Sequence, residues 1–175
     1  MEGYKGDSSN PRELPPDALF ERDSWILPAT LEIIEHAGQA FKKKLEKDGW
    51  STDEVFGLFI GFHEALVNAV VYGSLGIADS ERDLEDLVKE ELEKNPGKKD
   101  RKVYVSMEIS EERVYMRIRD EGKGFDFRDV SDPEFPQGVK RFKGRGMSLM
   151  RVYFDSVDYI GNGNEVILEK KRKNN

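Results

Sequence analysis

The chain has 175 residues, of which 36% are charged, with a formal net charge of −7 and no cysteine. This length suits one domain with a substantial core, and the acidic balance argues against a general nucleic-acid-binding surface. Without cysteine, neither a disulfide framework nor a thiolate metal site can form. No secretory or membrane-spanning run is evident at either end, so we expect a cytoplasmic protein with neither nucleic acid nor membrane as a partner.

The first part of the chain changes from irregular to periodic. Residues 1–19 are rich in proline, glycine, serine and charge without periodicity, which predicts a flexible arm before a domain over 20–175. Trp25–Leu27 is a short apolar run. From Thr30 to Asp48 apolar residues recur at helical spacing. A strand followed by an amphipathic helix is therefore expected.

A second, more apolar helix follows. Ser51–Glu54 has the form of a capping box, and the helix is expected to run through Tyr72 and stop at Gly73. Glu64 and Asn68 stand out in it, because they lie four residues apart on one face of a largely apolar helix. Taken alone, such a pair is typical of an exposed polar stripe.

A strongly charged segment, residues 78–101, comes next, and we interpret it as a helical insertion between the helix of Asn68 and the next strand. Ser80–Lys94 carries a narrow apolar stripe and predicts a surface helix. It ends at Asn95–Gly97, and Lys98–Lys102 is a basic turn. This cluster could contact phosphate or a partner, although a solvated loop is the simpler interpretation.

Two alternating segments, 103–109 and 114–120, predict an antiparallel hairpin whose second strand ends in an acidic turn. In this turn, Gly122 and Gly124 permit positive φ and close approach of the backbone to a ligand. The carboxylate of Asp120 can accept a hydrogen bond from a purine amino group. By itself, the motif is more typical of a hairpin turn.

The last third of the chain holds a long aperiodic stretch and a glycine motif. Residues 126–143 contain two prolines and few apolar residues, which predicts a mobile functional loop. Gly144-Arg-Gly146 is expected to open a helix over Met147–Tyr153 and to offer its backbone amides to phosphates, with Arg145 and Lys143 adding charge. A closing hairpin is expected around 161–164.

The three polar motifs, in this order, resemble the N, G1 and G2 boxes of the Bergerat-fold ATPases, which include gyrase, heat-shock chaperones and sensor histidine kinases. Within that superfamily the chain is most similar to the small bacterial anti-sigma factor serine kinases. The segments that carry this likeness are Glu64–Ala69, Tyr72–Ile77 and Gly163–Leu168, and the resemblance covers about residues 20–171.

The resemblance implies an α+β fold: a two-layer α/β sandwich with a mixed, mostly antiparallel sheet covered on one face by helices, and an ATP lid over 126–143. It implies ATP and Mg²⁺ as cofactors, with Asn68 as the protein ligand of the metal and Glu64 as the catalytic base. The cofactor-binding set is then Asn68, Asp120, Gly122, Gly124, Lys143, Gly144, Arg145, Gly146 and Met147.

The resemblance also implies a function: a serine/threonine protein kinase that binds a sigma factor and phosphorylates a STAS-domain antagonist. It implies a homodimer as well, since relatives of this type tend to be dimers. Two alternatives remain open, namely a nucleotide-gated binding module without catalysis and a stand-alone ATPase or kinase in another signalling pathway. Tyr72 and Ser148 depart from the pattern, since relatives often have histidine and glycine there. A complete sensor histidine kinase is not expected, because neither His36 nor His63 lies in a phosphoacceptor helix.

Overall fold

The fold is known from a computed structural model that describes residues 17–78, 80–127 and 142–173. Within the last range, side chains are described from residue 147 onward. Statements about the structure below refer to these parts of the chain.

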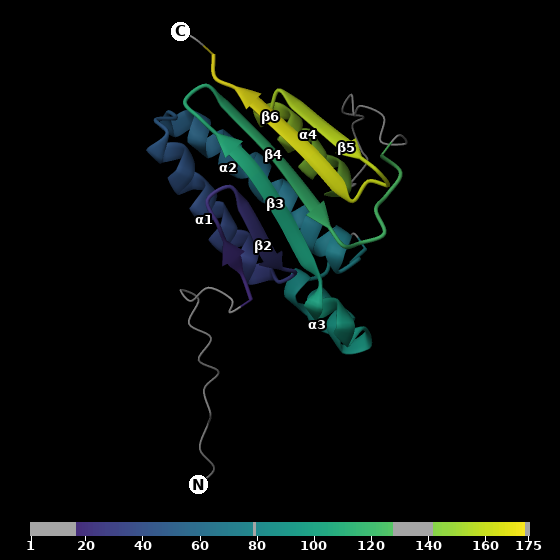
Figure 1. The fold of residues 1–175 in the computed structure, drawn as a ribbon. Coiled ribbons are helices and arrows are strands. Elements are labelled where there is room, and N and C mark those ends of the chain that lie inside the picture. Colours follow the sequence, from purple (N-terminus) through teal and green to yellow (C-terminus); the bar gives the residue numbers. More distant parts are fainter. Residues whose placement is uncertain (1–16, 79, 128–141, 174–175) are drawn as a thin grey trace.

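One six-stranded sheet forms half of the molecule (Figure 1). Its strand order is β1-β2-β3-β4-β6-β5, and each of its five described pairings is antiparallel, where a mixed sheet was expected. The strands are β1 (Leu19–Phe20), β2 (Ser24–Pro28), β3 (Lys102–Ile109), β4 (Arg113–Asp120), β5 (Ser156–Ile160) and β6 (Glu165–Lys171).

The helices form the second layer, on one face of the sheet (Figure 1). This layer contains α1 (Leu31–Lys47), α2 (Thr52–Val67) and α4 (Phe142–Tyr153), whereas α3 (Leu84–Lys94) projects from one end of the sheet. The predicted two-layer α+β sandwich is confirmed. The predicted capping box is also present, since Ser51 and Glu54 exchange side-chain-to-backbone hydrogen bonds at the start of α2.

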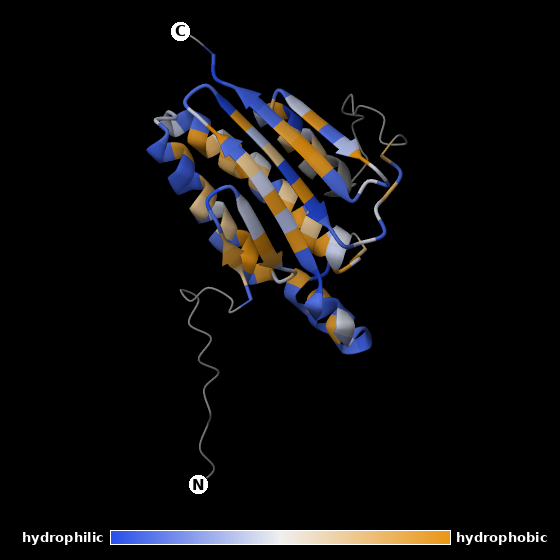
Figure 2. Ribbon diagram, in the orientation of Figure 1, coloured by the Kyte–Doolittle hydropathy of each residue, from blue (hydrophilic) through white to orange (hydrophobic). Residues whose placement is uncertain are grey.

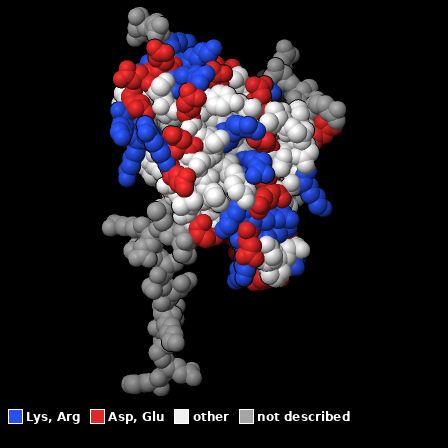
Figure 3. Space-filling view, in the orientation of Figure 1, with Lys and Arg blue, Asp and Glu red and all other residues white. Residues whose placement is uncertain are grey.

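Hydrophobic and hydrophilic residues alternate along the strands of the sheet (Figure 2). Because successive side chains point to opposite faces, this alternation decides which of them face the helices. In β4, Val114, Met116 and Ile118 are buried toward the helix layer. Because side chains alternate with period two, Asp120 shares that inward face. The opposite face is open, and in Figure 3, which views it directly, acidic and basic groups are interspersed.

Aromatic side chains hold the two layers together. Phe62 of α2 lies with its ring centroid 4.5 Å from that of Phe41 in α1 and 6.2 Å from that of Trp25 in β2. All three side chains are almost fully buried. Truncating a buried aromatic ring typically costs about 3–5 kcal/mol, so this cluster fixes α1 and α2 against the sheet.

Helix α4 approaches α2 closely because two glycines of α2 face it. A Cβ atom at Gly57 would stand 2.5 Å from the ring of Tyr153, and one at Gly61 would stand 2.7 Å from the ring of Phe154. No side chain fits at either position without movement of these rings. The two glycines therefore set the position of α4, which carries the third motif.

The second helix differs from its prediction after Val67. The α-helical pattern ends there, and residues Asn68–Ser74 continue as a π-helix, η1. The Leu75 amide bonds the Val70 carbonyl, five residues back, at 2.9 Å. Apolar periodicity does not distinguish the two helix types, and π segments occur often at functional sites.

The start of α4 also differs from its prediction. The helix begins at Phe142, five residues before the expected start at Met147. Glycine lowers helix propensity by about 1 kcal/mol per residue but does not prevent a helix, and no proline lies in this segment. The glycine motif is therefore part of the helix rather than a loop before it.

The segment Thr52–Ser74 is long and apolar enough to cross a membrane by length and composition alone. In the fold it is the central helix, packed between α1, α4 and the sheet. Its apolar character follows from this buried position.

Candidate functional site

Asp120 is the last residue of β4, on the face of the sheet that is covered by the helices. It is only 7% exposed, and its Oδ1 accepts a hydrogen bond from the Gly122 amide at 2.7 Å. Burial raises the pKa of Asp120 to about 6, although the Gly122 hydrogen bond and the charge of Arg101 act in the opposite direction. A buried carboxylate at a strand end is a specific acceptor for a donor group on a ligand.

The end of η1 meets this acidic turn through two glycines. A Cβ atom at Gly73 would stand 2.4 Å from the Asp120 carboxylate, and one at Gly122 would stand 2.2 Å from the Gly73 carbonyl oxygen. Only glycine fits at either position without movement of the backbone or the carboxylate. The first and second motifs of the sequence are therefore in direct contact.

The backbone of the turn is held by the hairpin between β5 and β6. The Asp120 amide donates to the Asn164 carbonyl at 2.9 Å, and the Asn164 side-chain amide donates back to the Asp120 carbonyl at 3.0 Å. The Phe125 amide bonds the Asn162 carbonyl at 2.9 Å. Gly124 has φ +75°, and a Cβ there would stand 2.0 Å from that same carbonyl oxygen.

The simple hairpin-turn interpretation of Asp120–Gly124 is therefore wrong. Strand β4 pairs with β3 and β6, so the chain after this turn does not fold back as the next strand. Instead the turn is packed between the end of η1 and the hairpin at 161–164. Such packing fixes a turn whose own residues form no regular structure.

Glu64 and Asn68 lie one helical turn apart, and both are half-buried. The Glu64 side chain is 28% exposed, and its Oε1 is 4.0 Å from Nδ1 of His63. Asn68 is the first residue of η1, and its Nδ2 donates to the hydroxyl of Tyr159 at 3.5 Å. The pair is therefore neither fully solvated nor enclosed in the core.

The basic turn of the insertion anchors the end of η1. Nζ of Lys98 donates to the Leu75 carbonyl at 2.7 Å, and Nη1 of Arg101 donates to the Ser74 carbonyl at 2.6 Å. Cations at a helix C-terminus donate hydrogen bonds to its free carbonyls and interact favourably with the negative end of the helix dipole. The solvated-loop interpretation is wrong for these two residues. The basic cluster was visible in the sequence, but its partners were not.

Tyr159 is a site residue that the sequence motifs did not reveal. It stands opposite Val166, which is buried toward the helices, so it faces inward from β5. Its ring centroid is 4.9 Å from that of Phe125 and 6.2 Å from that of Phe127. Burial raises the pKa of Tyr159 to about 12, and the charge of Asp120 adds to this rise. In the sequence, only the apolar alternation of β5 could have indicated that Tyr159 faces inward.

The third motif is described by its backbone alone, except at its end. Lys143, Gly144, Arg145 and Gly146 occupy the first turns of α4, and their side chains lie outside the described part of the chain. Gly144 is the third helical residue, so its amide is among those without a partner inside the helix. Met147 is 6% exposed and packs in the core. Of the predicted lid, residues 128–141 lie outside the described residues.

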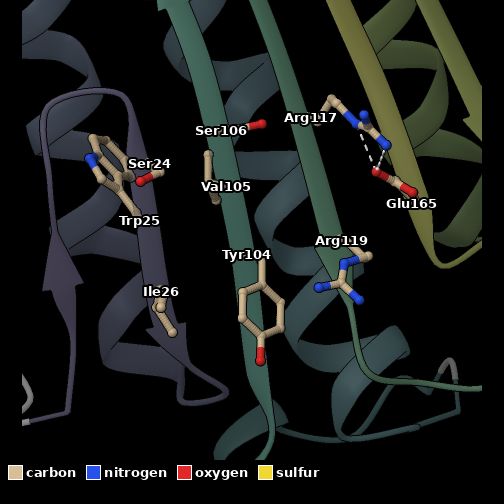
Figure 4. Close-up of a pocket in the computed structure, with 9 residues that line it drawn as sticks. All are labelled: Ser24, Trp25, Ile26, Tyr104, Val105, Ser106, Arg117, Arg119 and Glu165. Carbon is tan, nitrogen blue, oxygen red and sulfur yellow. Dashed lines mark hydrogen bonds and ion pairs between the residues drawn. The ribbon is translucent and has the colours of Figure 1, made fainter.

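A depression of about 400 Å³ lies elsewhere, on the open face of the sheet (Figure 4). There Arg117 is paired with Glu165, and Arg119 lies over the ring of Tyr104 at 4.6 Å. These side chains point away from the helix layer, and Asn68 and Asp120 are not part of this depression.

The described residues suit a nucleotide with a magnesium ion. Among them there is no cluster of three or more histidine, cysteine or acidic residues that could bind a metal on its own. Mg²⁺ that is bound mainly by nucleotide phosphates and water needs few protein oxygens, and Asn68 can supply one. The Asp120 carboxylate is buried and can accept a hydrogen bond from a donor group of a ligand.

The chain matches the family model described as histidine kinase-like ATPase domain, over residues 27–170. No curated protein matches it significantly. Because the match covers most of the chain, the protein belongs to the histidine kinase-like ATPase domain family, and the predicted Bergerat-type fold is confirmed. It is accordingly an ATP-binding domain of the regulatory type.

Proposed function

We propose that this protein is an ATP-dependent serine/threonine protein kinase of the anti-sigma type. The observation that supports catalysis is the position of Glu64, one helical turn before Asn68 and partly exposed. If Asn68 is at the metal end of the nucleotide, a carboxylate one turn away is close to the terminal phosphate. A domain that only binds nucleotide has no need of that carboxylate.

The nucleotide is held at two ends in this proposal. Asp120 accepts a hydrogen bond from the 6-amino group of adenine. Asn68 supplies its amide oxygen to Mg²⁺, which neutralises charge on the phosphates when it is bound. The amide of Gly144 at the start of α4 faces the phosphates, with the charges of Lys143 and Arg145 nearby in sequence.

The reaction is a transfer of the γ-phosphoryl group to a protein hydroxyl. Glu64 takes the proton as the substrate oxygen forms its bond to γ-phosphorus, and the bond from that phosphorus to the β–γ bridging oxygen breaks, so that ADP leaves. A positioned general base contributes typically about 10²- to 10⁴-fold to such a rate. The same carboxylate would serve hydrolysis if water occupied the position of the hydroxyl.

The partners in this proposal come from the resemblance of the sequence motifs. They are a sigma factor, which the protein sequesters, and a STAS-domain antagonist, whose serine or threonine it phosphorylates. A cytoplasmic location and a homodimer belong to the same proposal. The net charge of −7 favours basic protein surfaces over nucleic acid as partners.

The direct test is transfer of labelled γ-phosphate to each STAS-domain protein of the source genome. Wild-type protein is compared with Glu64→Gln, and with Glu93→Gln as a matched control on the exposed surface of α3. We expect phosphorylation of a serine or threonine in one candidate, its loss by at least about 100-fold in Glu64→Gln, and wild-type activity in the control. ATP binding without any transfer would instead favour a nucleotide-gated binding module or a plain ATPase.

A further inference from the structure

The side chain of Asn68 has two chemically different ends. Its amide nitrogen only donates hydrogen bonds, and its amide oxygen only accepts them or binds a cation. A side chain that is free to rotate presents the oxygen to a metal only part of the time. Any group that holds the nitrogen end therefore increases the fraction of useful orientations.

Tyr159 contacts the nitrogen end. Nδ2 of Asn68 donates to the Tyr159 hydroxyl at 3.5 Å, which is longer than the usual N–H···O distance of about 2.7–3.2 Å and therefore a weak hydrogen bond. The two residues are 91 positions apart, so the contact joins the start of η1 to the edge strand β5. A tyrosine hydroxyl both donates and accepts hydrogen bonds, so it can accept this one from the Asn68 amide.

The ring of Tyr159 is fixed independently of Asn68. It lies edge-on to Phe125, at 77°, and stacks on Phe127. Phe125 in turn is bonded through its amide to the Asn162 carbonyl at 2.9 Å. The hydroxyl is thus held by the same structure that supports the turn of Asp120.

We propose that Tyr159 is a positioning residue for Asn68: its hydroxyl takes the Nδ2 end of the amide and leaves Oδ1 free for the Mg²⁺ of the bound nucleotide. This inference rests on the proposed function. It also ties the metal end of the site to the adenine end, because Tyr159 packs on the turn that begins at Asp120.

The variant Tyr159→Phe tests the proposal, because it removes the hydroxyl and keeps the ring contacts. Tyr115→Phe, on the open face of the sheet, is the matched control. Affinity for ATP is measured by calorimetry for both variants and for the wild type, once with Mg²⁺ and once with EDTA. We expect Tyr159→Phe to lose about 10-fold in affinity with Mg²⁺ and less than about 2-fold in EDTA.

A second readout needs no nucleotide. The side-chain amide protons of Asn68 are identified in a ¹⁵N–¹H spectrum by their disappearance in Asn68→Ala. They should shift in Tyr159→Phe and not in Tyr115→Phe. A Tyr159→Phe protein that binds Mg·ATP as the wild type does, or loses the same factor with and without Mg²⁺, overturns the proposal. Failure of the wild type to bind ATP at all would instead overturn the proposed function.

Discussion

The Cα atom of Gly73 lies directly against the carboxylate of Asp120, so that a Cβ at this position would stand 2.4 Å from the carboxylate. The contact joins the helix of Glu64 and Asn68 to the turn of Gly122 and Gly124. It leaves no room for a methyl group unless Asp120 moves. Glycine at position 73 is therefore required by this contact and not by its own backbone, because it lies inside η1 and has no positive φ.

Gly73→Ala tests this contact. The added methyl group must displace the Asp120 carboxylate, and we expect ATP affinity to fall by at least about 10-fold, with a loss of about 1–3 kcal/mol in the free energy of unfolding. Gly97→Ala is the control, because a Cβ there meets nothing within 4 Å. Calorimetry and urea denaturation measure the two effects. Wild-type affinity in Gly73→Ala would show that Asp120 does not bind the nucleotide.

The affinity for ATP should depend on pH through Asp120. Burial raises the pKa of this carboxyl to about 6, so it loses its charge and its best acceptor oxygen as the pH falls through that value. From pH 7 to pH 5 we expect affinity to fall by about 10-fold. The variant Asp120→Asn is the control, because the pH dependence of its ATP affinity comes only from the other groups, including the phosphates. Parallel profiles for the two proteins would contradict the assignment.

The ionised carboxylate of Asp120 should lower the free energy of unfolding at neutral pH. A folded-state pKa above the ordinary value of 3.8 means that the contribution of Asp120 is most favourable below pH 3.8 and is lost as the pH rises through about 6. At pH 7, the free energy of unfolding of Asp120→Asn should therefore exceed that of the wild type by up to roughly 3 kcal/mol, so the variant is the more stable protein. Urea denaturation at pH 7 and pH 4 measures this gain, which should fall below about 1 kcal/mol at the lower pH. A less stable variant at pH 7 would refute this sign.

Removing Arg101 should weaken the end of η1. Arg101→Ala leaves the Ser74 carbonyl without its donor and takes a positive charge away from Asp120. We expect a loss of about 1.5–3 kcal/mol in stability, as for hydrogen bonds to charged groups, and a shift of the pH midpoint for ATP binding to higher pH. Lys99→Ala, at an exposed neighbouring position, should change neither quantity. An unchanged midpoint in Arg101→Ala would remove Arg101 from the site.

Local patterns predicted much of this fold. The alternation over 103–109 and 114–120 predicted the hairpin of β3 and β4, and the capping box predicted the start of α2. The order of three short polar motifs indicated the family, which the comparison with known families confirms. Each of these signals lies within a few residues of sequence, where period and capping chemistry are legible.

The remaining parts of the site depend on contacts between distant segments. Asn68 and Tyr159 are 91 residues apart, and Arg101 reaches a carbonyl 27 residues away. The residue types of β5 and of the basic turn do not indicate which distant residues they contact. The π-helical form of Asn68–Ser74 was missed for another reason, since an apolar helix has the same residue pattern with either hydrogen-bond register.

One calorimetric comparison decides whether Asp120 and Asn68 build an adenine-nucleotide site. Mg·ATP and Mg·GTP are titrated into the wild type, Asn68→Ala and Asp120→Asn. We predict that the wild type binds ATP at least about 100-fold more tightly than GTP, because GTP presents an oxygen where Asp120 needs a donor. Asn68→Ala should lose the tight Mg·ATP complex, and Asp120→Asn should lose the preference for adenine. No binding of ATP by the wild type, or equal binding of both nucleotides, would show that Asp120 and Asn68 do not form this site.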